Sequence, residues 1–563
     1  MRTLFIFLIF SIELVSAQEY KFLVQLKDKN NSGFSVSQPS AFLSGKAIQR
    51  RKKQNIPIDQ TDLPVTEAYI DSLSAIQFLR VQNRSRWFNQ VLISVPDTSI
   101  LQKVRQFSFV TSSQPVNNRQ LKKIPYRYSI NQVRASSGRA GLENTGSVSG
   151  IISPSQYGAS FSQIHTHHGE FLHNLGFQGE GKTIAILDDG FNNYLYNPAF
   201  DSLRNNHRIL GTYDFVHQKT SVNEEANHGA LCFSIVASNL PGTLIGTARA
   251  ASYWLFKTED DSSETPVEEQ NWVAAAEFAD SVGADLITTS LGYGYFDDPK
   301  YNLTYGERDG HTSLISRAAN LAVAKGMIVT ASAGNSGIDS LETKFVSCPA
   351  DGDSVYAVGA IDFFGRIAGF SSWGPNGSGQ VKPDGVSIGL NTFLIAPDGN
   401  SYTGSGTSFS NPNLAGLITC LWQAFPEFNA HDILSAVRQS SDLYANPDGR
   451  FGYGIPDFEK AYQILLLKKM EGIRPLTASD WLHVFPIPFH ESFEIFVLPA
   501  ATGTADIQLL DVGGKLIQSE TLQIKAGLSL RVTIRLRISV SAGGYFVRYT
   551  DSKNTKTIKV LKD

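Results

Sequence analysis

Three short segments of this chain hold residues whose types and order suit acyl-transfer chemistry. Asp188 lies in Ile-Leu-Asp-Asp-Gly, His228 in Asn-His-Gly and Ser408 in Gly-Thr-Ser-Phe-Ser-Asn-Pro. An Asp, a His and a Ser in this order form one of the known catalytic triads, in which the imidazole takes the serine proton and the carboxylate orients the imidazole. Asn335, in Ala-Ser-Ala-Gly-Asn, adds an amide that can stabilise an oxyanion. Together the four residues predict a nucleophilic serine with its supporting groups.

Each of these residues also has an ordinary structural interpretation. Ser408 could simply cap the helix that we expect to follow, with Pro412 in its first turn. His228 could be a helix-cap or core histidine, and Asn335 could be a turn residue. The α/β-hydrolase nucleophile motif is excluded, because it needs Gly two residues after the serine and the chain has Ser410 there.

Two adjacent carboxylates compete for the role of the orienting acid. We prefer Asp188, because it directly continues the apolar run Thr-Ile-Ala-Ile-Leu, which reads as a buried strand. Asp189 could instead cap the loop or bind a cation.

The segments that must position these residues alternate between strand and helix from Gly179 onward. Expected strands lie at 182–187, 251–256, 285–291, 327–333 and 355–359, and expected helices at 230–238, 271–280, 313–325 and 413–425. Such alternation predicts an α/β fold with a mostly parallel sheet flanked by helices. Active sites in these sheets lie beyond the carboxyl ends of strands, where Asp188, Ser290 and Asn335 fall.

Composition changes along the chain divide its 563 residues into several parts. A basic start, a short apolar run and Val-Ser-Ala predict a secretory signal peptide. The last part shows short alternating strands separated by Gly/Asp turns, as in a small β-sandwich. The predicted parts are a signal peptide (1–17), a small α/β domain (18–120), a Ser- and Gly-rich linker or processing region (121–154), the main domain (155–465), a linker (466–480) and the β-sandwich (481–563).

The charge and the cysteine count limit the function classes. The net charge of -3 excludes nucleic acid as an expected partner, because phosphate binding needs a basic excess. The chain has three cysteines, an odd number that cannot form a complete disulfide framework. We interpret them as buried small hydrophobic residues, although the sequence allows one disulfide bridge between two of them. They are Cys232, Cys348 and Cys420.

A histidine-rich segment precedes the main domain's first strand. With Glu170 its histidines suggest a metal site, but their spacing fits no compact zinc motif, so the default interpretation is a solvated helix face and no metal is assigned. These histidines are His165, His167, His168 and His173.

At this point the main domain resembles the subtilisin-like serine peptidases, or subtilases. The matching segments are Asp188-Asp189-Gly190, His228-Gly229, Ser290-Leu291-Gly292 and 406–412. The resemblance implies a subtilisin-like catalytic domain, a triad of Asp188, His228 and Ser408 and an oxyanion donor in Asn335. It also implies an extended substrate beside Ser290, Leu291 and Gly292, with Ala333 and Gly334 in the pocket wall.

Three residues depart from the family pattern without removing a reacting atom. They are Asp189, Ala230 and Phe409, which replace the usual Ser/Thr, Thr and Met. Extra negative charge at Asp189 could raise the pKa of His228. The segment 331–334, with Ser347 nearby, carries no charge, which favours a neutral or apolar side chain in the substrate.

The flanking parts resemble the other pieces of a secreted zymogen. Residues 18–120 would be an inhibitory, chaperone-like propeptide. The C-terminal part resembles the sorting domain of the type IX secretion system, through Phe-Pro-Ile-Pro-Phe (485–489), Leu-Asp-Val-Gly-Gly-Lys (510–515) and a Lys-rich end. The implied partners are protein or peptide substrates, the chain's own propeptide and an outer-membrane secretion machinery.

The chain is therefore expected to be a secreted or cell-surface serine endopeptidase, exported through the periplasm. Its chemistry would require no cofactor, and the resemblance is compatible with structural calcium. A rival hypothesis is a catalytically weak relative that acts as a surface protein-binding or scaffold protein. A second rival makes the C-terminal part a carbohydrate-binding or adhesion domain.

Overall fold

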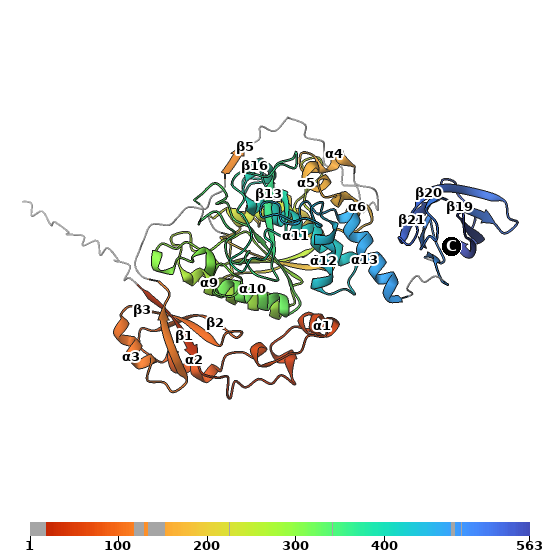
Figure 1. Ribbon diagram of the computed structural model, residues 1–563. Helices are drawn as coiled ribbons and strands as arrows, with labels where there is room; N and C mark the ends of the chain where they lie inside the picture. Colours follow the sequence, from red (N-terminus) through yellow and green to blue (C-terminus); the bar gives the residue numbers. More distant parts are fainter. Residues whose placement is uncertain are drawn as a thin grey trace, which may run out of the picture. The chain divides into compact units, whose positions relative to one another are not determined.

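The computed structural model describes residues 19–117, 129–132, 153–223, 226–340, 342–473, 479–485 and 487–562 (Figure 1). Two compact units divide the chain, one reaching Tyr462 and one starting at Gln463. The predicted signal peptide and most of the predicted processing region lie outside the described residues. No helix in the described part of the chain is long and apolar enough to cross a membrane.

A seven-stranded sheet forms the centre of the first unit, and every neighbouring pair in it is parallel. This confirms the predicted mostly parallel sheet. Most of these strands are apolar and buried along their whole length, as expected for a sheet covered on both faces. In spatial order the strands are β14 (Gly385–Ile388), β13 (Tyr356–Ile361), β12 (Ile328–Ser332), β11 (Leu286–Thr289), β6 (Thr183–Asp188), β10 (Ser252–Lys257) and β7 (Ile209–Asp214).

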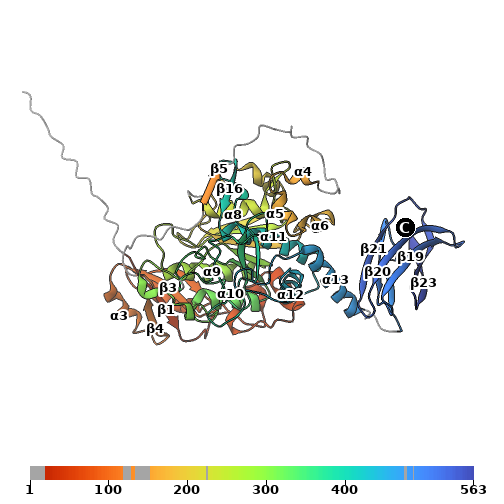
Figure 2. The same ribbon diagram turned by 45° about the horizontal axis from the view of Figure 1, so that its top comes forward.

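Two pairs of helices pack on this sheet. α9 (Pro266–Val282) and α10 (Leu314–Ala324) contact each other and share an apolar core with the sheet. α8 (His228–Ala237) and α11 (Thr407–Ala424) form the other pair, and α11 packs along β11 to β14. In Figure 2, which labels all four helices, α9 and α10 lie below α8 and α11. The remaining helices of this part are α4 (Pro154–Tyr157), α5 (Phe161–His165), α6 (Gly169–Asn174), α7 (Asp201–Asn205), α12 (Ala430–Ser440) and α13 (Phe458–Ile473).

Local signals in the sequence explain where α9 begins and ends. Thr265 and Glu268 form a reciprocal capping box, and Pro266 occupies the first turn, where its missing N–H costs nothing. Gly283 ends the helix with φ of 83°, a conformation that favours glycine. These signals lengthen the predicted helix, 271–280, by about a turn at its start.

The N-terminal domain is a four-stranded sheet with short helices and its own apolar core. Its sheet has the order β2–β3–β1–β4 and its pairs are antiparallel. The apolar residues of 91–95 belong to one of these strands. The elements are β1 (Tyr20–Leu26), β2 (Arg80–Ser85), β3 (Gln90–Val95), β4 (Val110–Pro115), α1 (Gly45–Lys53), α2 (Glu67–Ser74) and α3 (Leu101–Val104).

Buried ion pairs join this domain to the end of α9. Arg51 contacts Asp280 at 2.7 Å and Asp62 of its own domain at 3.1 Å, and Arg86 also reaches Asp280 at 3.1 Å. The Glu277 carboxylate accepts hydrogen bonds from the main-chain N–H groups of Arg86 at 2.8 Å and Trp87 at 3.0 Å. Because Asp280 is buried and shared by several arginines, removing one of them would weaken the compensation of its charge.

The second unit contains two antiparallel sheets that share one apolar core, which confirms the predicted β-sandwich (Figure 2). Its core alternates with exposed positions along the longer strands, as in β19 and β22. One sheet comprises β17 (Leu482–Phe485), β18 (Ser492–Val497) and β21 (Leu530–Arg535). The other comprises β20 (Leu516–Ile524), β19 (Gly503–Asp511), β22 (Gly543–Thr550) and β23 (Thr555–Lys562).

Candidate active site

Adjacent strand ends bring the predicted site residues to one edge of the central sheet. Asp188 is the last residue of β6, Ser290 directly follows β11, and Asn335 lies three residues beyond β12. These three strands are neighbours in the order β12–β11–β6. His228 and Ser408 come from the first turns of α8 and α11. The topology therefore gathers residues that are up to 220 positions apart in the sequence.

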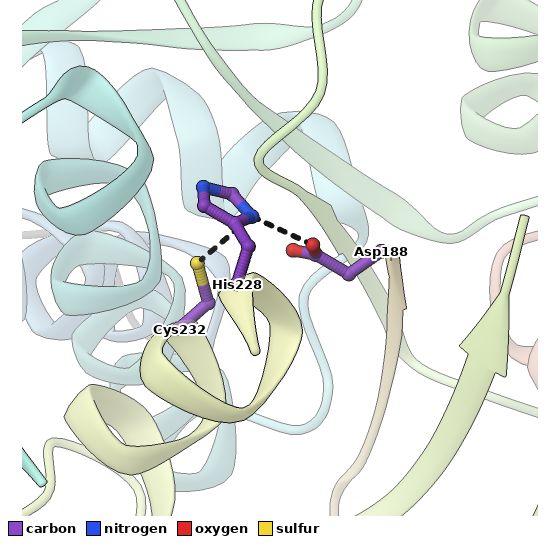
Figure 3. Close-up of side chains that lie close together, drawn as sticks. All are labelled: Asp188, His228 and Cys232. Atoms are coloured by element: carbon purple, nitrogen blue, oxygen red, sulfur yellow. Dashed lines mark hydrogen bonds and ion pairs between the residues drawn. The ribbon is translucent and has the colours of Figure 1, made fainter. Parts of the chain in front are cut away.

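A short hydrogen bond joins Asp188 to His228. The Nδ1 atom of His228 lies 2.7 Å from Asp188 Oδ1, and both side chains are fully buried. Figure 3 shows the second ring nitrogen directed away from Asp188. Burial alone would lower the pKa of His228, but the Asp188 carboxylate outweighs it and holds this pKa well above its ordinary value. The pair therefore stabilises an imidazolium, as a general base requires.

Asp189 has a different contact from Asp188. Its Oδ1 accepts a hydrogen bond from the Gly229 N–H at 2.9 Å, at the start of α8. Burial and the neighbouring Asp188 charge raise the pKa of Asp189 to about 7. A carboxylate at a helix N-terminus is favourable, so Asp189 serves as an anchor for α8. This geometry supports Asp188 as the orienting acid.

The helix that carries Ser408 begins earlier than predicted. α11 starts at Thr407, so Pro412 lies in the second turn, and our placement of Pro412 in the first turn is wrong. Proline lacks the N–H that would bond to the carbonyl four residues earlier, which is that of Ser408. This carbonyl instead accepts hydrogen bonds from Ser290 Oγ at 2.9 Å and from Cys232 Sγ at 3.3 Å. The helix is thus pinned to β11 and α8 at the residue that carries the candidate nucleophile.

The Ser408 hydroxyl itself donates to the main-chain oxygen of Ser290 at 3.3 Å. Ser408 is buried, and its main-chain N–H belongs to the first turn of α11, where helical N–H groups have no partner within the helix.

Cys232, which we did not assign to the site from the sequence, lies beside both His228 and Ser408. Its Sγ is 3.9 Å from His228 Nδ1 (Figure 3). The same Sγ donates to the Ser408 carbonyl. Burial raises the pKa of this thiol, which keeps it protonated and a poor nucleophile. All three cysteines are buried, as predicted, and the disulfide bridge that the sequence left open is not formed.

Asn335 is oriented by Thr407, the residue before the candidate nucleophile. Its side-chain oxygen accepts hydrogen bonds from the Thr407 N–H at 2.8 Å and from the Thr407 hydroxyl at 2.9 Å. These two bonds fix which end of the amide faces α11. Thr407 was not singled out from the sequence, because a Thr in a helix's first turn is an ordinary residue.

A cavity of about 500 Å³ opens at this edge. Gly292 and Gly334 face Ser347, and a Cβ added to Gly292 would lie only 2.4 Å from Ser347 Oγ, so a larger residue would close the cavity there. Ala333 is fully buried, and the neighbouring Ser332 lines the cavity. The predicted site residues on its wall are Ser290, Leu291, Gly292, Gly334, Asn335 and Ser408.

The segment 331–334, which we expected to form an uncharged wall, makes up only part of the wall of this cavity. Glu264, Asp297, Asp339 and Arg308 also line it. Arg308 is almost fully buried and donates to main-chain oxygens, among them that of Glu342 at 2.7 Å. The preference for a neutral or apolar substrate side chain therefore stays a prediction.

A buried group of three glutamates lies next to the cavity, with ligand atoms within 4.8 Å of one another. Glu268 accepts hydrogen bonds from the N–H groups of Thr265 and Asp260 at 2.7 and 3.1 Å, and Glu259 accepts from Tyr293. These hydrogen bonds give Glu259 and Glu268 a structural role. The third member is Glu264.

The expected solvated histidine face is wrong for two of its four members. His167 is buried between the Pro456 carbonyl and Ser387 Oγ, and His173 is buried between Tyr157 and the Thr247 carbonyl. Burial lowers the pKa of both to about 4, which makes them neutral core residues. The other two, His165 and His168, pair with Glu170 and Asp457.

Comparison with protein families assigns the domains. Residues 179–454 match the model of the subtilase family. This part of the chain is a subtilase domain. Residues 21–131 match the peptidase S8 propeptide domain of Bacteroidota, and residues 483–563 match the secretion system C-terminal sorting domain. The resemblances drawn from the sequence are thereby confirmed, and the sorting domain implies export to the cell surface or the medium.

Curated relatives of the subtilase domain are bacterial serine proteases. A thermophilic serine proteinase of Bacillus sp. (strain AK1) is 29% identical over 285 residues, covering 49% of this chain and 60% of the relative. Serine protease AprX of Bacillus subtilis (strain 168) is 28% identical, covering 50% of this chain and 66% of the relative. Subtilisin E of the same strain is 27% identical, covering 52% of this chain and 68% of the relative. The chain thus spans less than two thirds of the first of these relatives.

Proposed function

We propose that the chain is a secreted serine endopeptidase in which Asp188, His228 and Ser408 form the catalytic triad. The observation that carries this proposal is the 2.7 Å bond between buried Asp188 and His228, with Ser408 pinned beside them by Cys232 and Ser290. The membership of this domain in the subtilase family supports it independently.

The proposed reaction proceeds through an acyl-enzyme. The Ser408 hydroxyl passes its proton to His228 Nε2 and attacks the peptide carbonyl. The imidazolium, stabilised by Asp188, gives that proton to the leaving amine. Water then hydrolyses the ester by the reverse proton route. Only residues of the chain and water take part, so the reaction calls for no cofactor, and structural calcium stays a prediction.

The oxyanion formed in each step needs hydrogen-bond donors. We assign this role to the side-chain amide of Asn335 and the main-chain N–H of Ser408. Support comes from Thr407, which holds the amide oxygen and so leaves the NH₂ group of Asn335 as the end that can donate to an oxyanion. Donors fixed before the reaction stabilise developing charge without reorganisation.

Substrate is proposed to bind extended beside Ser290, Leu291 and Gly292, adding a strand through main-chain hydrogen bonds. Gly334 and Ala333 would contribute the facing wall. The exposed backbone at Gly292 and the cavity beside Ser408 support this path. Protein and peptide chains are therefore the proposed substrates.

The flanking domains suggest how the enzyme is controlled and delivered. The N-terminal domain is proposed to act as an inhibitor of its own catalytic domain, supported by its buried ion pairs with α9. The C-terminal domain is proposed to engage an outer-membrane secretion machinery of the type IX kind after passage through the periplasm.

The decisive experiment is casein hydrolysis by the purified chain beside Ser408→Ala, with mass spectrometry of the chain ends. Ser410→Ala is the matched control, because Ser410 lies on the same helix and its hydroxyl bonds to the Thr407 carbonyl. We expect loss of hydrolysis and of self-processing in Ser408→Ala alone. Equal activity of wild type and Ser408→Ala would refute the triad and favour the scaffold hypothesis.

A further inference from the structure

A second cavity, of about 320 Å³, lies between the N-terminal domain and the subtilase domain. It is at the edge of the central sheet opposite the active site. Lys182 lines it and directly precedes β6, whereas Asp188 ends the same strand, so the two residues are about 20 Å apart. Among the other lining residues are Lys46, Arg50 and Lys53 of α1 and Asp285 and Trp422 of the subtilase domain. Both domains therefore contribute to this cavity.

Basic side chains outnumber carboxylates on the wall of this cavity. Its charged residues are Lys46, Arg50, Lys53, Lys182, Glu180 and Asp285. Arg50 is paired with the buried Asp280, and Glu180 is paired with Arg208 at 3.5 Å. Among the described residues of the wall, three ammonium groups thus share one remaining carboxylate. The cavity keeps a positive excess that suits an anion.

Lys182 is the most buried of these three ammonium groups and is poorly satisfied. Its side chain is 12% exposed, and its Nζ lies 3.8 Å from Asp285 Oδ1, which is longer than a hydrogen bond. Its Nζ also lies 4.2 Å from the centre of the Trp422 ring. Burial lowers the pKa of Lys182, Asp285 raises it, and the charges of Lys46 and Lys53 lower it again. The three ammonium groups therefore repel one another, and an anion among them would relieve that repulsion.

Asp285 cannot balance all three ammonium groups, because other donors already hold it. Its Oδ2 accepts hydrogen bonds from the Thr183 N–H at 2.8 Å and from Lys46 at 2.7 Å. Lys46 is in turn satisfied by Asp285 and by the Thr183 hydroxyl at 2.6 Å. Lys53, in the last turn of α1, is exposed and forms no ion pair in the described part of the chain. The positive charge that is left over belongs to Lys53 on one domain and Lys182 on the other.

We propose that this cavity binds a free multivalent oxyanion, such as inorganic phosphate, between Lys53 of the N-terminal domain and Lys182 of the subtilase domain. Lysine ammonium groups are established phosphate ligands that act as point charges. Repulsion from Asp285 is small, because Lys46 and the Thr183 N–H already compensate its charge. No bond is made or broken, so the anion acts only as a ligand.

An oxyanion at this place would hold the two domains together. Lys46 and Lys53 leave with the N-terminal domain, so the separated subtilase domain keeps only the Lys182 side of the site. A ligand that binds the joined form better than the separated domains stabilises the joined form by mass action. Because we propose that the N-terminal domain inhibits the subtilase domain, the oxyanion would prolong this inhibition. That consequence rests on the proposed function, whereas the binding site itself does not.

The first test titrates inorganic phosphate into the full chain with Ser408→Ala, by calorimetry at constant ionic strength in chloride. We expect one bound phosphate, with an affinity at least about tenfold lower in Lys182→Met and about threefold lower in Lys53→Gln. Lys52→Gln is the matched control and should bind like the parent, because Lys52 is an exposed neighbour on α1 outside the cavity wall. Lys53 is exposed, so Lys53→Gln keeps the test decisive if Lys182→Met does not fold. No binding, or one affinity in all variants, would overturn the inference.

The second test measures the lag before the full chain with an intact Ser408 hydrolyses casein, in phosphate and in chloride of equal ionic strength. With phosphate at about ten times its measured Kd, we expect a lag about three- to tenfold longer in the parent and in Lys52→Gln. The lag of Lys53→Gln should change much less. Equal lags in phosphate and chloride, despite phosphate binding, would overturn the coupling of the two domains. If Ser408→Ala hydrolysed casein like the parent, the proposed function would fail, while the calorimetry would still decide whether the site exists.

Discussion

Replacing Asp188 by Asn tests the core of the proposed mechanism without changing the volume of a buried side chain. Asp188 is fully buried and contacts His228 Nδ1 at 2.7 Å. The amide has no negative charge, and its NH₂ group can face Nδ1 and favour the wrong imidazole tautomer. Both effects act on the ability of His228 to take the Ser408 proton.

The magnitude follows from the geometry. With charge centres about 4 Å apart and an effective dielectric constant of about 20, the carboxylate stabilises the imidazolium by about 4 kcal/mol. At about 1.4 kcal/mol per decade, this equals a loss of about 10³ in rate. The unfavourable tautomer adds to this loss, so we expect kcat to fall by about 10³ to 10⁴.

The assay compares Asp188→Asn with Asp189→Asn after both are matured in trans by tagged wild-type enzyme. Asp189→Asn is the same Asp-to-Asn exchange at the neighbouring position, but it affects the hydrogen bond from the Gly229 N–H and not the contact with the imidazole. We expect it to keep kcat within about tenfold, since the triad stays intact. The reasoning would be refuted if Asp189→Asn lost the larger share of activity while Asp188→Asn stayed active.

Three further predictions concern the same unit. Asp188 holds the pKa of His228 above its ordinary 6.5, and the imidazole must be neutral to accept a proton. We therefore expect kcat/KM to rise with pH through a midpoint above 6.5. A pH profile with its midpoint below 6.5 would contradict this. Asn335→Ala should lower kcat by about 10² to 10³ with little change in KM in steady-state peptide assays, and a pure KM effect would argue against an oxyanion role. In a Ser408→Ala background, Arg51→Met should lower the free energy of unfolding by about 2–3 kcal/mol in denaturant titration, because it removes a buried cation shared by Asp62 and Asp280, although other cations still contact both carboxylates. As a control, Arg84→Met removes an exposed ion pair and should lower the free energy of unfolding by at most about 1 kcal/mol. Equal losses in the Arg51 and Arg84 variants would refute the buried-pair argument.

Periodicity predicted the central sheet and the order of its site residues because strand and helix patterns there are strong. The apolar runs before Asp188 and Asn335 have no competing interpretation, and the parallel topology follows from alternation with helices. The start of α11 was harder to predict, because Pro412 normally marks a helix's first turn. Tertiary hydrogen bonds from Ser290 and Cys232 to the Ser408 carbonyl allow the proline one turn later.

Side-chain contacts between distant segments could not be read from the sequence. His167 and His173 look like polar surface residues, yet their partners are main-chain carbonyls, a hydroxyl and a phenol contributed mostly by remote elements. Cys232 lies four residues after His228, one helical turn away, so its closeness to the imidazole was detectable from spacing alone. The orientation of Asn335 by Thr407 depends on the loop after β12 meeting the start of α11, which no local pattern encodes.

The central claim is that Ser408 is an activated nucleophile, and labelling with a fluorophosphonate tests it most directly. The trans-matured wild type, Ser408→Ala and His228→Ala would be treated with the probe, and the labelled peptide identified by mass spectrometry. We predict one label, on Ser408, that is absent in Ser408→Ala and forms at least 10³-fold more slowly in His228→Ala. Labelling of another residue, or equal labelling of all three proteins, would contradict the account.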